Sequence, residues 1–417
     1  MKRLPYTTFS LPVPELRRGY YTAVYFWREK RILEEEKINK KSLMQVFNKV
    51  DGATVCGVDE ALAILRLGCG YWKDYKKMPP LFDRYIALKQ SLRSASVRNE
   101  LDEIQKITVL ICEIRHELNN LWVDTHENLH IKALRDGDAS SAYDAVMTIE
   151  GNPSEYAHLE SIYLGVLARG TKIATNTRLV VESANGKPIL FFSDRFDRWY
   201  NQVADGYAAM KSGVYGVATD AMGEWWGVSG LGTTPHALIA IYEGDTAGAA
   251  LAFNKYYPNV QTIALVDFHN DCVKTSLEVA RAFAEKGKTL WGVRLDTSDT
   301  MVDRSVISMM GQFKPTGVCA PLVENVRNAL DREGFNEIKI VVSGGFHPSR
   351  IEEFERLQIP VDAYGVGSWL LTGSYDYTAD IVRVDGNDMA KAGRIFRPSN
   401  LLEEFEWQEV EGDNGRQ

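Results

Sequence analysis

Short apolar runs alternate with amphipathic segments of helical length in the second half of the chain. Two of the intervening segments, 275–286 and 321–333, carry apolar residues at steps of three and four, as helices do when they bury one face. Continuous Val/Ile/Leu runs that alternate with helices are typical of a parallel sheet covered on both faces. The pattern therefore predicts an α/β fold with four consecutive parallel strands, at 263–267, 290–296, 338–342 and 361–368.

The first part of the chain has a different pattern. Apolar residues recur at helical spacing through much of 80–130, while shorter apolar runs at 43–50 and 146–151 predict strands. Asp59 stands where it would cap a helix over 60–67. The strand–helix alternation begins near residue 155, and strand and turn signals return after residue 377. These changes predict three segments: an N-terminal domain with a helical insertion (1–154), a β/α barrel domain (155–376) and a C-terminal segment of strands and turns (377–417).

The composition is that of an ordinary globular protein, with 45% hydrophobic and 25% charged residues among 417. A net charge of −8 argues against non-specific nucleic-acid binding, which needs a basic face. No apolar run is long enough to cross a membrane, and the N-terminus lacks the apolar core of a signal peptide. The five cysteines include no CxxC pair, so we expect reduced thiols, no metal site built from them, and a cytoplasmic protein.

Two glycine-rich segments follow neighbouring predicted strands. Ser343, Gly344 and Gly345 come after one strand, and Gly365 and Gly367 end the next. Glycine pairs are also the commonest punctuation of tight turns. Consecutive glycine-rich strand ends, however, are typical of the phosphate site of a β/α barrel, where open backbone N–H groups hold the anion. We therefore expect a bound phosphate here.

Charged residues stand at the ends of two other predicted strands. Arg294 and Asp296 occupy alternate positions and so point to the same face. A charge pair inside an apolar run is unfavourable unless it borders a polar cavity or is fully hydrogen-bonded. Asp267 ends the preceding strand, and carboxylates suit sugar hydroxyls or Mg²⁺. We expect functional roles for all three.

A histidine and an aromatic–arginine set complete the candidates. His236 follows a Gly/Thr/Pro loop, where exposure would let its imidazole act as a base, a phosphate contact or a nucleophile. Phe192 and Arg195 could stack a flat ring and pair with its carboxylate, although a strand end with a surface ion pair would look the same. The aromatic cluster around Tyr25 has the same two interpretations.

Five motifs in this order resemble those of the type II phosphoribosyltransferases, and most closely the nicotinate phosphoribosyltransferases. The resemblance runs from about residue 20 to 375. Its motifs are Val24-Tyr-Phe, Gly232-Thr-Thr-Pro-His-Ala-Leu-Ile, Val293-Arg-Leu-Asp296, Ser343-Gly-Gly-Phe and Gly365-Val-Gly-Ser.

The resemblance implies an irregular, incomplete β/α barrel plus an α/β sandwich built from the N- and C-terminal segments, in a homodimer whose active sites take residues from both subunits. It implies transfer of a phosphoribosyl group from 5-phosphoribosyl 1-diphosphate to nicotinate, with Mg²⁺ accompanying the diphosphate. Nicotinate mononucleotide and diphosphate would be the products, and ATP would be a co-substrate that acts through a phosphohistidine.

The family's roles carry over to matching positions of this chain. His236 would be the phosphohistidine, Asp296 would bind the ribose hydroxyls, Arg294 would contact the donor, and Asp267 would face the sugar or the magnesium-bound diphosphate. The remaining residues fall into two groups. Ser343, Gly344, Gly345, Gly365 and Gly367 would hold the 5′-phosphate. The substrate-binding residues would be Tyr25 (from the partner subunit), Phe192 and Arg195, which contact the base, and Thr234.

One departure from the family leaves the choice of base open. Relatives commonly carry Asp two residues before the stacking tyrosine, where this chain has Ala23. A quinolinate enzyme should need several basic residues for two carboxylates, and only Arg195 is obvious. A nicotinamide enzyme is a further possibility, as is a weakly active phosphoribosyl- or nucleotide-binding regulatory protein. A sugar-phosphate aldolase would want a strand-end Lys, which is lacking.

Overall fold

The computed structural model describes residues 2–407 of the chain. These divide into two compact units: unit 1 comprises 1–171 and 374–417, and unit 2 comprises 172–373. Each is described by itself, and the predicted C-terminal segment 377–417 is covered only as far as Trp407. Within the described residues, no helix combines the length and apolar character that a membrane crossing requires.

Unit 1 is built on a six-stranded antiparallel sheet in the order β15-β14-β1-β7-β5-β16. Strand β14 pairs with β1, so segments from the N- and C-terminal parts of the chain share one sheet, as the sandwich prediction requires. Two two-stranded sheets, β2-β6 and β3-β4, complete the strands. Their bounds are β1 (Ser42–Asn48), β2 (Ala53–Thr54), β3 (Gly70–Trp72), β4 (Trp122–Asp124), β5 (His130–Ala133), β6 (Ala139–Ser140), β7 (Ala145–Gly151), β14 (Tyr377–Val384), β15 (Asn387–Asp388) and β16 (Glu403–Phe405).

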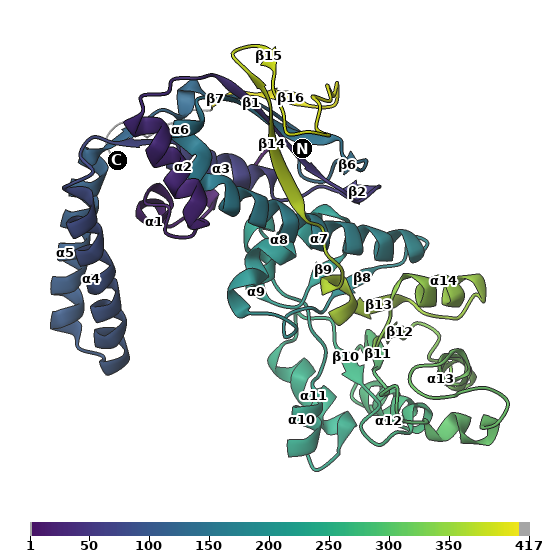
Figure 1. Cartoon of the computed structure of the whole chain (residues 1–417). Coiled ribbons are helices and arrows are strands. Elements are labelled where there is room, and N and C mark those ends of the chain that lie inside the picture. The colour runs from purple at the N-terminus through teal and green to yellow at the C-terminus, as the bar shows by residue number, and fades with distance from the viewer. Residues whose placement is uncertain (1, 408–417) are drawn as a thin grey trace. The chain divides into compact units, whose positions relative to one another are not determined.

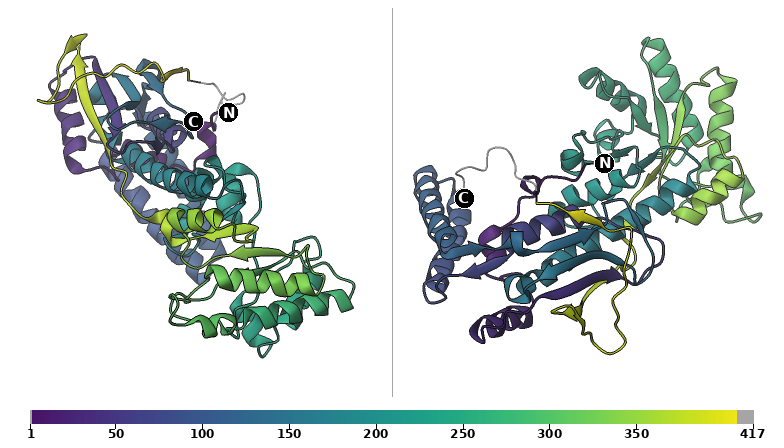
Figure 2. Two further views of the ribbon diagram at one scale, coloured as in Figure 1. Left: turned by 90° about the vertical axis from the view of Figure 1, so that its right-hand side faces the viewer. Right: turned by 90° about the horizontal axis from the view of Figure 1, so that it is seen from above.

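The helices of unit 1 include an antiparallel pair, α4 and α5, within the segment 80–130 that was expected to be mostly helical (Figure 1; Figure 2). Buried residues recur along α5 at Ile107, Ile114 and Leu118, a seven- and four-residue spacing that keeps one stripe against α4. The helical bounds are η1 (Tyr6–Thr8), α1 (Val13–Arg17), α2 (Val24–Glu35), α3 (Val58–Gly68), α4 (Met78–Arg98), α5 (Leu101–Leu121), η2 (His126–Asn128), α6 (Pro153–Tyr156), η3 (Ala157–Leu159) and α7 (Glu160–Ser183), which continues into unit 2.

The expected cap of α3 was wrong. The helix begins at Val58 with Gly57 at its N-cap, and Asp59 lies in the first turn. Its carboxylate instead accepts hydrogen bonds from the Leu4 backbone N–H (2.8 Å) and from Arg3 Nη1 (2.9 Å). The acid therefore ties the N-terminal segment to the helix, a long-range partner that local spacing does not reveal.

Unit 2 is built on a six-stranded, entirely parallel sheet in the order β10-β11-β12-β13-β8-β9. Helices connect successive strands (Figure 1), and the buried strands read as continuous apolar runs because helices cover a parallel sheet. The predicted α/β fold with an incomplete β/α barrel is confirmed. The strands are β8 (Ile189–Phe191), β9 (Gly216–Val217), β10 (Ile263–Leu265), β11 (Gly292–Leu295), β12 (Lys339–Val342) and β13 (Ala363–Val366).

The two helices that were predicted in unit 2, at 275–286 and 321–333, correspond to α12 and α13. The side chain of Asp271 caps α12 by accepting from the Lys274 N–H at 3.3 Å. The bounds are η4 (Trp199–Asn201), α8 (Gln202–Lys211), α9 (Asp220–Gly223), η5 (Glu224–Trp226), α10 (His236–Ile241), α11 (Thr246–Tyr256), α12 (Cys272–Glu285), η6 (Arg304–Met309), α13 (Ala320–Arg332), α14 (Pro348–Arg356) and η7 (Ser368–Leu371).

Candidate active site

The candidate residues of unit 2 gather at one edge of its sheet. Phe192, Asp267, Asp296, Ser343 and Gly367 each lie one or two residues past the end of β8, β10, β11, β12 or β13. Because these strands are parallel neighbours, their carboxyl ends share an edge. Segments far apart in the sequence are therefore brought together there.

Arg294 is the centre of a closed polar network. Its Nε donates to Ser343 Oγ (2.8 Å) and its Nη2 to Asp296 Oδ2 (2.9 Å), while the Ser343 hydroxyl donates to Asp296 Oδ1 (2.7 Å). Nη1 donates to Thr233 Oγ1 at 3.1 Å. The side chains of Arg294 and Asp296 are only 18% and 21% exposed. This half-buried ion pair is retained because hydrogen bonds satisfy both partners, and it presents a fixed set of polar groups.

His236 and Asp267 form a second pair, with Nε2 and Oδ1 2.9 Å apart. His236 is the first residue of α10 and 45% of its side chain is exposed, against 9% for Asp267. Burial raises the pKa of Asp267, the hydrogen bond and charge of His236 oppose this rise, and the nearby Asp296 adds to it. When the carboxylate accepts the Nε2 proton, Nδ1 of the imidazole keeps its lone pair.

The Ser343–Gly345 turn requires both of its glycines. Gly344 and Gly345 have φ values of +88° and +72°, in the left-handed region that side chains disfavour. The turn lies beside Asp296, since a Cβ at Gly344 would be in ordinary van der Waals contact with Asp296 Oδ1, at 3.5 Å. The turn therefore presents bare backbone beside the acidic end of the Arg294 network.

Arg350, which the sequence reasoning missed, supports this turn from behind. Its Nη1 donates to the carbonyls of Gly344 (2.9 Å) and Gly345 (3.3 Å), and its Nη2 donates to the Val318 carbonyl (2.9 Å). Its guanidinium lies over the Phe346 ring at 4.4 Å, and burial lowers its pKa. The sequence did contain a signal for this role, because Arg350 stands near the start of the helix that follows the Gly344–Gly345 pair.

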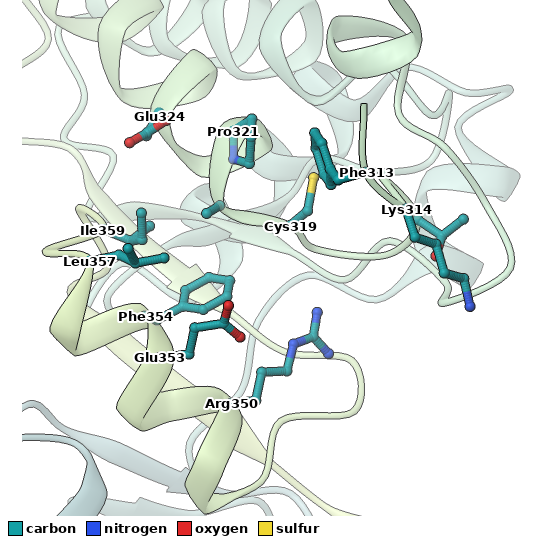
Figure 3. Close-up of a pocket in the computed structure, with 12 residues that line it drawn as sticks. Phe313, Lys314, Cys319, Pro321, Glu324, Arg350, Glu353, Phe354, Leu357 and Ile359 are labelled. Atoms are coloured by element: carbon teal, nitrogen blue, oxygen red, sulfur yellow. The ribbon is translucent and has the colours of Figure 1, made fainter. Parts of the chain in front are cut away.

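The same guanidinium borders a pocket of about 520 Å³ between α13 and α14. Figure 3 shows Arg350, Glu353 and Phe354 extending from α14 towards Cys319 and Pro321 at the start of α13. The glycine turn is thus backed by a hydrogen-bonded arginine and a cavity. Its lining comprises Phe313, Lys314, Thr316, Cys319, Ala320, Pro321, Glu324, Arg350, Glu353, Phe354, Leu357 and Ile359.

The glycines of the next strand end make room for aromatic rings. A Cβ at Gly365 would lie 2.5 Å from Cε2 of Phe192, and one at Gly367 would lie 2.6 Å from Cε2 of Phe196. The guanidinium carbon of Arg294 stands 5.0 Å from the centroid of the Phe192 ring. Gly365 and Gly367 therefore position Phe192 and Phe196, and Phe192 is joined to the polar network through Arg294.

The three other predicted substrate-binding residues, Thr234, Arg195 and Tyr25, lie outside the Arg294 network. Thr234 is fully buried, and its hydroxyl accepts from the Leu265 N–H at 2.9 Å, so it fastens the loop to β10; its neighbour Thr233 is the residue that contacts Arg294. Arg195 is exposed and lies 5.7 Å from the Phe196 ring. Tyr25 belongs to α2 of unit 1, where the residue is 62% exposed.

Ala23 occupies the N-cap of α2 and has no side-chain acceptor to offer there. Its own N–H donates to Ser161 Oγ at 3.1 Å, which links the start of α2 to α7. The helix start that carries Tyr25 is therefore held by a serine from another helix.

No cluster of three or more His, Cys, Asp or Glu side chains suited to a metal ion occurs within residues 2–407. The Asp267–Asp296 neighbourhood offers two carboxylates whose mutual repulsion a cation would relieve. Such a pair suits an ion that brings its own ligands, as a magnesium–diphosphate complex does.

Sequence comparison relates the chain to two curated proteins of Mycobacterium tuberculosis, nicotinate phosphoribosyltransferases pncB1 and pncB2. They are 28% and 25% identical over 259 and 251 residues, which is 59% and 58% of this chain. The aligned parts make up 52% and 49% of the relatives, so the chain spans about half the length of the curated relatives it matches. No family model matches the chain.

Structural comparison agrees with this relationship. A nicotinate-nucleotide pyrophosphorylase from Pyrococcus furiosus superposes with a TM-score of 0.68 at 27% identity, covering 95% of this chain and 82% of that one. Human nicotinic acid phosphoribosyltransferase superposes with a TM-score of 0.60 at 15% identity, covering 88% and 75%, and shows the shared fold alone. The two curated relatives confirm the resemblance to the nicotinate phosphoribosyltransferases.

Proposed function

We propose that this chain is a nicotinate phosphoribosyltransferase of NAD salvage. It would transfer the phosphoribosyl group of 5-phosphoribosyl 1-diphosphate to the ring nitrogen of nicotinate, releasing nicotinate mononucleotide and diphosphate. The observation that carries the proposal is the Arg294–Asp296–Ser343 network beside the left-handed Gly344–Gly345 turn. A carboxylate for a polyol, a fixed cation for a phosphorylated donor and bare backbone for a phosphate then lie at one sheet edge.

The donor would lie along this edge. The turn at Ser343–Gly345 would hold the 5′-phosphate through backbone N–H groups, since bare backbone permits close approach. Gly365 and Gly367, which were expected to share this role, are covered by the Phe192 and Phe196 rings and would position those rings beside the phosphate. Asp296 would accept the ribose hydroxyls. Mg²⁺ would enter with the diphosphate as part of the substrate and meet the carboxylate side of Asp267 and Asp296, where it would stabilise the leaving charge.

The reaction requires little proton transfer by the protein. As the C1–oxygen bond to diphosphate breaks, positive charge develops on the ribose and negative charge on the leaving group, while the lone pair of the pyridine nitrogen forms the new C1–nitrogen bond. Catalysis then depends on positioning and electrostatic stabilisation. The site agrees with this requirement because its acids, Asp267 and Asp296, are already paired with His236 and Arg294.

The pyridine ring would stack on Phe192, with its carboxylate paired to Arg195. Phe192 is held against Gly365, and the exposed Arg195 forms no ion pair with a carboxylate of the described residues. Tyr25 of a second copy would cover the other face of the ring, which makes a homodimer with shared sites part of the proposal. Its high exposure in a single chain supports such a contact.

ATP would be coupled through His236. Nδ1 would attack the γ-phosphorus of ATP, the bond to the bridging oxygen would break with release of ADP, and water would later hydrolyse the phosphohistidine. The support is the Asp267 hydrogen bond at Nε2, which leaves Nδ1 as the nucleophile, together with the exposure of the imidazole.

A product assay tests the proposal. The protein is supplied with 5-phosphoribosyl 1-diphosphate and Mg²⁺ and, in parallel, nicotinate, nicotinamide or quinolinate, each with and without ATP. We expect nicotinate mononucleotide from nicotinate, at a rate that ATP increases. Carbon dioxide release from quinolinate would instead identify the decarboxylating enzyme. No mononucleotide from any base would favour the regulatory binding protein, and an Ala23→Asp variant would then be assayed for restored activity.

A further inference from the structure

Unit 1 contains a separate pocket of about 290 Å³ that the proposed reaction does not use. It lies where the C-terminal ends of α1, α3 and α5 approach strand β4. Its volume is at the lower end of the range for small-molecule sites, so it suits a compact ligand. The lining comprises Tyr6, Val13, Pro14, Arg17, Arg66, Leu67, Arg115, Asn119, Trp122 and Asp124.

The charge of this pocket is strongly one-sided. Three guanidinium groups, from Arg17, Arg66 and Arg115, come from three different helices, and Asp124 is the one acid among the lining residues. Arg115 is exposed and has no ion pair within the described residues. Three positive charges against one negative charge leave a net charge of +2 on the lining.

The one acid is already engaged by a neighbour. Asp124 Oδ1 accepts from His126 Nδ1 (2.6 Å) and from the His126 backbone N–H (3.0 Å). Burial acts to raise the pKa of Asp124, but these hydrogen bonds and the charge of Arg17 outweigh burial, so its pKa lies below the usual value. His126 Nε2 in turn contacts Arg66 Nη1. Asp124 therefore orients His126 and, through it, Arg66.

Arg17 is held rigidly at the wall of the pocket. Its Nε donates to the Leu67 carbonyl (2.9 Å), its Nη1 donates to Asn119 Oδ1 (3.0 Å), and its guanidinium lies 5.3 Å from the Trp122 ring. Burial lowers its pKa to about 10, against the attraction of Asp124. Its hydrogen-bonded partners are neutral, so its positive charge lacks a direct counter-ion within residues 2–407. Such a preoriented guanidinium is well suited to an anion with several oxygens.

We propose that this arginine pocket binds the phosphoryl group of a small phosphorylated compound, whether free phosphate, diphosphate or a nucleoside monophosphate. A dianion matches the net charge of the lining, and the tetrahedral oxygens can accept from several guanidinium groups at once. Every lining residue belongs to unit 1, whereas the glycine turns proposed for the donor phosphate belong to unit 2. The proposal does not rest on the phosphoribosyl reaction.

The test is a calorimetric titration of the full chain with inorganic phosphate, repeated with diphosphate and with adenosine monophosphate to distinguish the three sources. The key variants are Arg115→Gln and Arg115→Glu, because Arg115 is exposed on α5 and its replacement should not unfold the protein. Arg93→Gln, which removes an exposed arginine from the neighbouring α4, is the matched control. Crystals soaked in arsenate locate the bound anion through its anomalous signal.

We expect the phosphate affinity of one class of site to fall by about tenfold in Arg115→Gln and by more in Arg115→Glu. The phosphate affinity of Arg93→Gln should equal that of the unmodified protein. Arsenate should lie between Arg17, Arg66 and Arg115. The proposal is overturned if phosphate affinity in Arg115→Glu equals that of the unmodified protein, or if arsenate occupies only the glycine turns of unit 2. Because binding is measured without turnover, an inactive enzyme with an intact arginine pocket would contradict the proposed function alone.

Discussion

The two six-stranded sheets of this chain use polar residues in opposite ways. The parallel sheet of unit 2 collects them at its carboxyl edge, where Arg294 and Asp296 remain partly exposed. The antiparallel sheet of unit 1 has turns at both ends and no common carboxyl edge. Its helices instead bury charges deep inside: Lys30 is fully buried, and Glu15 is only 1% exposed.

The buried ammonium group of Lys30 has all of its partners within the fold. Lys30 Nζ donates to the carbonyls of Gly70 (2.6 Å) and Ser154 and lies 3.0 Å from Glu34 Oε1. Burial lowers the pKa of Lys30, and Glu34 opposes that shift. At the edge of unit 2, by contrast, His236 keeps one nitrogen for a ligand. Polar groups stabilise a fold when their partners lie within it, and they serve a substrate when some capacity remains.

The largest effect should come from Asp296→Ala at the open edge of unit 2. Removal of the ribose-binding carboxylate should lower turnover by about 10³-fold, because this contact is expected to strengthen as charge develops on the sugar. Initial rates with saturating nicotinate measure it, and an unchanged circular dichroism spectrum would show that the fold persists. Asp299→Ala, which removes an exposed acid three residues further on, is the control and should retain activity. Comparable rates for the two variants would refute the role of Asp296.

The next largest effect should be Lys30→Met in unit 1. It leaves the buried carbonyls of Gly70 and Ser154 without their donor, and Glu34 keeps Arg31 as its remaining cation. The free energy of unfolding should therefore fall by about 3 kcal/mol. Urea denaturation measures the change. Lys40→Met breaks the exposed Lys40–Asp385 pair and should change stability by less than about 1 kcal/mol. Equal losses in both variants would remove the distinction between the two kinds of ion pair.

His236→Ala should abolish the stimulation by ATP and leave the ATP-independent phosphoribosyl transfer intact. The ratio of rates with and without ATP should fall to unity, because no imidazole remains to carry the phosphoryl group. The matched control is His269→Ala, another exposed histidine in unit 2, whose Nε2 contacts the Gly244 carbonyl. Full ATP stimulation in His236→Ala would exclude the phosphohistidine.

The smallest effect should be the contribution of Glu160 to the pH dependence of the free energy of unfolding. Burial, and then the charges of Glu29 and Asp380, raise the pKa of Glu160 to about 8. A carboxyl with a raised folded-state pKa stabilises most at low pH, and this contribution is lost as pH rises from near 4.5 through 8. Glu160→Gln should therefore flatten the decline in unfolding free energy between about pH 5 and pH 8 by about 1–3 kcal/mol, measured by denaturation at both pH values. An identical slope in the variant would contradict this account.

The sequence predicted the parallel sheet closely because its strands are buried on both faces and therefore read as uninterrupted apolar runs. Residues 338–342 were expected to form a strand, and β12 spans Lys339–Val342. The sequence also placed Arg294 and Asp296 on one face, since alternation in a strand is a local property. Their hydrogen bonds to one another and to Ser343 follow from that geometry.

The missed contacts depend on where a loop settles in three dimensions. Thr233 and Thr234 are adjacent, and only the pairing of the loop with β10 decides that Thr234 is buried and Thr233 meets Arg294. Arg350 reaches back to Gly344 from the following helix, a contact that no strand or helix period encodes. The roles assigned towards nicotinate, ATP and Mg²⁺ stay predictions, because they concern molecules that these contacts do not include.

Gly365 is a position at which one additional carbon atom would disturb the site. A methyl group there would stand 2.5 Å from the Phe192 ring and force the ring to move. Arg294, Asp296 and Ser343 would all remain in the sequence. A gene with a single nucleotide changed in this codon would thus preserve every charged residue of the site, yet encode a protein whose aromatic platform had shifted.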